Sequence, residues 1–159
     1  MPRKSGVKTY KLFIAGKRVQ THDVRDIESP YDGELIARVC QAGSEEMSSA
    51  VTAAEEAFPT LRDLPVYKRS EILEGIRDGI RNRFDEIVRT VALESGKPVK
   101  YARIEVRRAV STFDLASKYV MTLEGEILSS DIVEYGENRV TLVRRFPLGP
   151  VAAITPYNW

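Results

Sequence analysis

The 159-residue sequence is poor in the residues that build disulfides and metal sites, and its net charge is close to zero. Its one cysteine, Cys40, excludes an intrachain disulfide and is typical of a reducing compartment. Its one histidine, His22, has no second histidine or cysteine at a metal-binding spacing, so no metal site is expected. Lysine plus arginine (24) nearly balance aspartate plus glutamate (23), and the net charge of +1 offers no global attraction to nucleic acid.

Long apolar runs are also missing. No segment is long enough to span a bilayer, so no membrane partner is expected. The basic residues at the start lack the apolar core of a signal peptide, and residues 1–9 are interpreted as a disordered arm or an expression remnant. With 43% hydrophobic and 30% charged residues, the composition predicts one soluble, cytoplasmic domain with a core of its own.

Two turn motifs stand out in the first forty residues. Ala15-Gly16 separates two short apolar arms and has the length of a tight hairpin connection. The turn Ser29–Gly33 precedes a strand predicted over residues 34–40. Cys40 ends that strand and is predicted to be a packed thiol, while His22 is predicted to lie on the surface. A Cys–His dyad between the two remains the alternative.

Helical periodicity replaces these turns from residue 44 onward. Ser44 is the predicted N-cap of a first helix, and Pro59 is its predicted end. Two further helices are predicted over about 65–81 and 83–95. Gly96 follows the second of these and is predicted to be a left-handed C-cap.

The longest predicted helix opens at Lys97-Pro98, with Pro98 at its first position. Its apolar residues form one stripe in which small side chains recur, so another element is expected to approach closely: Ala102, Val106, Ala109, Phe113, Ala116 and Val120. After Thr122 the apolar period changes from 3.6 to 2. This change predicts a long antiparallel hairpin over residues 125–147, which needs a partner sheet because an isolated hairpin is marginally stable.

The last sixteen residues, 144–159, form the most specific motif of the chain. They read arginine, aromatic, Pro-Leu-Gly, an apolar run predicted to be a buried strand, and then Pro156-Tyr157-Asn158-Trp159. This segment resembles the aldehyde dehydrogenase superfamily. The turn Ser29–Gly33 and the stretch Glu94–Pro98 are similar to two further motifs of that family, in the same order along the chain.

The resemblance implies an α/β fold. The chain is expected to be the N-terminal part of an aldehyde dehydrogenase-like, doubly wound cofactor domain, helix-rich, with a projecting antiparallel β-hairpin. Residues 10–124 would form its helical and hairpin part, 125–147 an oligomerisation hairpin, and 148–159 the first strand of the nucleotide-binding sheet. The partners implied are an aldehyde substrate and, through the hairpin, further copies of the chain in a homo-oligomer.

The implied reaction is the NAD- or NADP-dependent oxidation of an aldehyde to a carboxylate through a cysteine thiohemiacetal. Asn158 matches the side-chain donor that stabilises the developing oxyanion. Residues that match the cofactor crevice are Ile154, Thr155, Pro156 and Tyr157. The nucleophile and the general base of the family cannot be placed on this sequence, so the chain alone is expected to be inactive.

Simpler readings remain open beside this one. Asn158 taken alone would be a turn residue at the end of a strand. Arginines spread along the helices suggest nucleic-acid binding, but they alternate with acidic residues and therefore predict an ion-paired, solvated face. The alternative function is a non-catalytic dimerising interaction module built from the helices and the hairpin.

Overall fold

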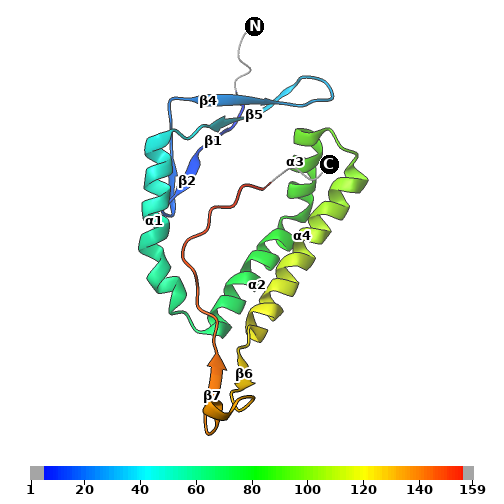
Figure 1. The fold of residues 1–159 in the computed structure, drawn as a ribbon. Coiled ribbons are helices and arrows are strands. Elements are labelled where there is room, and N and C mark those ends of the chain that lie inside the picture. Colours follow the sequence, from blue (N-terminus) through cyan, green and yellow to red (C-terminus); the bar gives the residue numbers. More distant parts are fainter. Residues whose placement is uncertain (1–5, 156–159) are drawn as a thin grey trace.

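The computed structural model describes residues 6–155 (Figure 1). A small sheet lies at one end, four helices form the body, and a hairpin projects from the opposite end. Helices therefore dominate an α/β architecture, as the sequence predicts.

The N-terminal sheet has three strands in the order β1-β5-β4. The central strand β5 (Leu35–Cys40) pairs parallel with β1 (Thr9–Tyr10) and antiparallel with β4 (Val24–Glu28). Two backbone hydrogen bonds close the turn that joins β4 to β5: the Ser29 N–H donates to the Glu34 carbonyl, and the Gly33 N–H donates to the Ser29 carbonyl, each at 2.8 Å. Strand β4 has no counterpart among the elements expected from sequence.

A separate hairpin pairs β2 (Leu12–Ile14) with β3 (Lys17–Val19). Its two connecting residues both have positive φ, 50° at Ala15 and 76° at Gly16. Positive φ at both positions is the geometry of a type I′ turn, whose twist matches that of the paired strands. The predicted hairpin is confirmed.

Helix α1 (Ser44–Arg62) begins and ends differently from the prediction. The N-cap is Gly43 and not Ser44, because the Glu46 carboxylate reaches back and accepts a hydrogen bond from the Gly43 N–H at 2.8 Å. The predicted end at Pro59 is also wrong, since the helix continues for three residues beyond it. Proline lacks only its own N–H, and the Pro59 carbonyl still accepts a bond from the Asp63 N–H at 3.1 Å.

Three helices form the core: α2 (Val66–Asn82), α3 (Phe84–Ser95) and α4 (Val99–Tyr119). Val88, Ala102 and Val106 are the buried residues at their centre, with Ala102 fully buried. A small side chain there allows α3 and α4 to approach closely, as the predicted stripe requires. Pro98 is the N-cap of α4 and not its first helical residue, so the helix begins at Val99, one residue later than predicted.

The projecting hairpin pairs β6 (Glu126–Ser129) with β7 (Val140–Val143) in antiparallel register. Its strands have four residues each, so the hairpin is shorter than the predicted one. The connection contains a short 3₁₀ turn, Glu134–Gly136, which takes these residues out of strand geometry. Every residue of both strands is exposed, and the hairpin extends away from the helices (Figure 1).

Residues 144–155 run back from the hairpin between α1 and the α2–α4 pair without joining a strand (Figure 1). The expected buried strand is therefore absent over residues 148–155, and Leu148 and Ile154 are almost fully exposed. A strand forms only when a neighbour accepts and donates backbone hydrogen bonds. Within residues 6–155, no strand is paired with this segment.

Candidate functional site

The site predicted from sequence lies at the end of the segment 144–155. Two of its residues, Ile154 and Thr155, are described, and both are exposed. Pro156, Tyr157 and Asn158 lie outside the described residues. The roles of Ile154, Thr155 and Asn158 therefore stay predictions.

An apolar cavity of about 520 Å³ lies beside the start of this segment. Its walls come from α1, from the first half of α2, and from residues 147–151. Phe58, Leu61 and Ile72 are among the side chains that line it. Within the described chain α1 contains no buried residue, so the apolar face of α1 is only partly covered. The cavity has the size of a ligand site, but its lining offers few polar groups to orient a ligand.

Cys40 is buried at the end of β5, with 1% of its surface exposed. Its sulfur accepts a hydrogen bond from Gln20 Nε2 at 3.4 Å, and the His22 side chain is exposed. The predicted packed thiol is confirmed, and the partner of its sulfur is an amide and not an imidazole. A thiol held in this way has neither the access nor the neighbouring base that a nucleophile requires.

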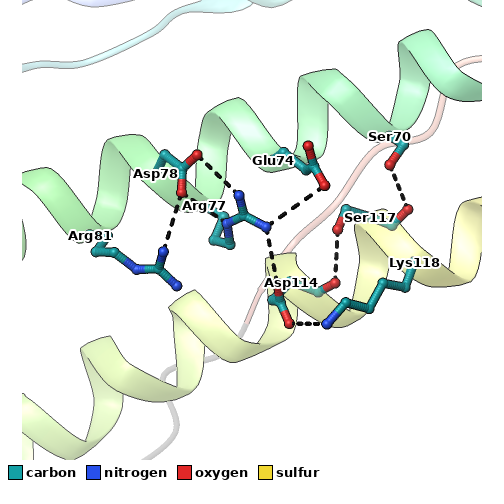
Figure 2. Close-up of polar contacts among 8 residues, drawn as sticks. All are labelled: Ser70, Glu74, Arg77, Asp78, Arg81, Asp114, Ser117 and Lys118. Atoms are coloured by element: carbon teal, nitrogen blue, oxygen red, sulfur yellow. Dashed lines mark hydrogen bonds and ion pairs between the residues drawn. The ribbon is translucent and has the colours of Figure 1, made fainter.

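The densest polar cluster joins α2 to α4 (Figure 2). The Arg77 guanidinium donates to Asp78 at 2.9 Å on its own helix and to Asp114 at 3.0 Å on α4. Asp114 also accepts a hydrogen bond from Lys118 Nζ at 2.6 Å, and Glu74 lies 3.8 Å from Arg77. Alternating charges predict ion pairs along a helix, but nothing in the sequence indicates that Arg77 would pair across to Asp114.

These contacts change the proton affinities of the cluster. Hydrogen bonds from Arg77 to Asp78 and Asp114 raise the pKa of the arginine. The hydrogen bond from Arg77 lowers the pKa of Asp78, and those from Lys118 and then Arg77 lower the pKa of Asp114. In Arg77, Asp78 and Asp114 the shifts all favour the charged form, which suits ion pairing and not proton transfer. The cluster therefore holds two helices together.

Two buried serines continue this connection along the same pair of helices (Figure 2). Ser70 Oγ donates to the Ser117 carbonyl at 2.8 Å, and Ser117 Oγ donates to the Asp114 carbonyl at 2.8 Å. Both hydroxyls have acceptors, as buried polar groups require. Ser117 is next to Ala116 of the predicted apolar stripe but is not part of that stripe, and no periodicity distinguishes it as a contact residue.

Metal sites and membrane-spanning helices are both absent from the part of the chain that the structure describes. Residues 6–155 contain no group of three or more histidine, cysteine or acidic side chains placed to bind a metal ion. Over the same range, no helix is long and apolar enough to cross a membrane.

Comparison with known proteins supplies the remaining findings. The model of the aldehyde dehydrogenase family matches residues 17–159. Lactaldehyde dehydrogenase from Methanocaldococcus jannaschii is 36% identical over 148 residues, which cover 93% of this chain and 30% of that protein. The malonate-semialdehyde dehydrogenase of Lacticaseibacillus casei is 34% identical, with 98% and 31% covered. The chain thus spans about 30% of the length of these curated relatives.

Solved structures agree with the sequence comparison. Aldehyde dehydrogenase 21 from Physcomitrella patens, in complex with the reaction product succinate, superposes with a TM-score of 0.82 at 33% identity. The match covers 86% of this chain and 28% of that one. An NAD-dependent aldehyde dehydrogenase from Sinorhizobium meliloti gives a TM-score of 0.77 at 26% identity, with 86% and 27% covered.

Proposed function

We propose, from the premise that this chain belongs to the aldehyde dehydrogenase family, that it forms the N-terminal portion of an NAD(P)-dependent enzyme oxidising an aldehyde to a carboxylate. The observation that carries the proposal is the family match over residues 17–159 together with the superposition on solved family members. Relatives named for lactaldehyde and malonate semialdehyde support the reaction class.

The residues near the end of the chain would contribute to cofactor binding. Ile154 is 97% exposed and carries an apolar side chain, which fits contact with the adenosine half of a dinucleotide. Pro156 and Tyr157 would continue the same contact surface. Bound NAD or NADP would supply the hydride acceptor of the reaction.

Asn158 would act as the oxyanion donor. When a nucleophile adds to the aldehyde carbon, negative charge develops on the carbonyl oxygen, and an amide N–H directed at that oxygen stabilises it. A carboxylate in this position would repel the same charge. The 159 residues include no exposed, base-activated cysteine, because Cys40 is buried and its sulfur accepts a hydrogen bond from Gln20. The nucleophile must therefore come from sequence beyond these residues.

The test is Asn158→Ala in the full-length polypeptide. We expect the single-turnover acylation rate to fall about 10²–10³-fold, because one oxyanion donor contributes on that scale. The dissociation constant for NAD should stay nearly unchanged, since the donor acts mainly in the transition state. Asn82→Ala, at the exposed end of α2, is the matched control and should leave both quantities at the wild-type level. An unchanged acylation rate in Asn158→Ala would remove the assignment.

The hairpin of residues 125–147 would serve assembly in a cytoplasmic homo-oligomer. All residues of β6 and β7 are exposed, and each strand has an unpaired outer edge within the described chain. Exposed edges favour pairing with a strand of another subunit. Residues 10–124 would then cover the nucleotide-binding sheet, and residues 148–159 would enter it as its first strand.

A further inference from the structure

Four arginines surround a cleft at the base of the projecting hairpin. The cleft has a volume of about 620 Å³ and lies where the end of α1, the start of α2 and the base of the hairpin meet. Arg62 and Arg69 line it from the helices, and Arg144 and Arg145 line it from the segment after β7. One carboxylate, that of Asp63, belongs to the same lining.

The backbone of Arg144, the first residue after β7, packs closely against Gly125. Gly125 precedes β6 and faces the end of β7, where a Cβ atom would collide with the Val143 carbonyl oxygen. The same Cβ would lie 3.7 Å from the Cα of Arg144. Because only glycine allows this approach, the backbone of Arg144 is held against the base of β6, at the wall of the cleft.

Most of the positive charge in the cleft is not neutralised. Arg62 is the exception, since its guanidinium binds Asp63 through two hydrogen bonds of 2.8 and 3.2 Å. Arg69 donates to the backbone carbonyls of Leu64 at 3.2 Å and Arg62 at 2.7 Å, which leaves its charge uncompensated.

The two arginines after β7 add to this excess. The Arg144 guanidinium lies 5.2 Å from the centre of the Phe146 ring. Among the ion pairs between described residues, none includes Arg144 or Arg145. Three arginines from two separate elements therefore surround one cavity without a carboxylate partner.

We infer that this cleft binds a small multivalent anion of the phosphate class. Guanidinium groups match the oxygens of phosphate with paired hydrogen bonds, and several uncompensated positive charges favour a ligand with more than one negative charge. Apolar side chains such as Val66 and Leu123 complete the walls of the cleft. An anion bound here would bridge the helices and the hairpin, because it would contact Arg69 on one side and Arg145 on the other.

Pyrophosphate is the probe that tests this site. It is titrated calorimetrically into the full-length polypeptide at fixed ionic strength and in saturating NAD, so that a cofactor site does not contribute to the heat. We expect saturable binding that equimolar chloride does not reproduce. Arg144→Gln and Arg145→Gln should each weaken pyrophosphate binding about 10- to 100-fold, the range for loss of a charged hydrogen bond.

Arg139→Gln is the matched control, because Arg139 is exposed in the connection of the same hairpin and does not line the cleft. Circular dichroism spectra and melting temperatures of all variants check that the fold is intact. Absence of pyrophosphate binding to the wild-type protein would overturn the inference. Equal weakening by Arg139→Gln and Arg145→Gln would also overturn it, since the binding would then be unspecific attraction to positive charge.

Discussion

Gly96 offers a sharp test of how the helices are joined to the N-terminal sheet. It ends α3 with φ of 68°, and its N–H donates to the Ala92 carbonyl at 3.0 Å. A Cβ added at this position would lie 2.9 Å from Cγ of Pro30, in the turn between β4 and β5. Gly96→Ala therefore meets two obstacles, a backbone conformation that disfavours a side chain and a contact that is too short.

The magnitude follows from these two effects. The left-handed conformation costs a residue with a Cβ about 1–2 kcal/mol. Crowding by one methyl group in a packed contact costs about 1–3 kcal/mol, depending on how far Pro30 yields. We therefore expect Gly96→Ala to lower the free energy of unfolding by roughly 2–5 kcal/mol. The urea midpoint of the full-length polypeptide measures this loss.

Gly79→Ala provides a control of opposite sign. Gly79 lies inside α2, and a Cβ there would meet no atom within 4 Å, so alanine should stabilise by about 0.8–1 kcal/mol. Combining Gly96→Ala with Pro30→Ala should recover the part of the loss that is due to crowding. If Gly96→Ala leaves the midpoint at or above the wild-type value, the cap and contact argument is refuted.

Three further predictions concern the ion-paired cluster, the hairpin and the isolated chain. The pKa of Asp114 is lowered from its ordinary 3.8 by Lys118 and Arg77. Ionised Asp114 therefore stabilises the fold at pH values above its ordinary pKa, and this stabilisation is lost as the pH falls through the lowered pKa. In Asp114→Asn the free energy of unfolding should consequently fall less steeply as the pH is lowered. Leu142→Lys, on an exposed strand of the hairpin, should dissociate the oligomer in sedimentation velocity without unfolding the subunit; an unchanged sedimentation coefficient would contradict this. The 159-residue chain alone should produce no NADH at 340 nm with aldehyde and NAD, and activity that disappears in Cys40→Ser would show that Cys40 has been misjudged.

Local signals were sufficient to predict most of the helical part. The stripe of α4 and the left-handed Gly96 follow from periodicity and from the conformational freedom of glycine. The predicted start of α1 differs by one residue, because the Glu46 carboxylate accepts a hydrogen bond from the Gly43 N–H, and the serine in the neighbouring position is the more usual N-cap. Pro59 does not end α1 as predicted, since within the last turns of a helix a proline removes a single hydrogen bond.

Contacts between distant segments account for what local signals missed. Strand β4 has the sequence Val-Arg-Asp-Ile-Glu, which does not alternate between apolar and polar residues. Its strand geometry comes from pairing with β5, and nothing local to residues 24–28 indicates this. The bond between Arg77 and Asp114 is of the same kind, because it depends on how α2 and α4 cross. At the predicted catalytic site, Asn158 lies outside the described residues, and its role is still supported only by the family motif.

Residues 144–155 form no strand, and the large exposed surface of the chain indicates why. The protein exposes 13215 Å², whereas a compact monomer of 17.9 kDa exposes about 8,000 Å². Much of the difference is apolar: Phe146, Leu148, Val151 and Ile154 are each at least 74% exposed. The apolar character of these residues predicts burial, but burial of a parallel strand requires neighbouring strands and covering helices. Residues 6–155 supply helices and no adjacent strand. The proposal of a larger enzyme, about three times as long, requires an exposed apolar surface of this size, which the rest of that enzyme would cover.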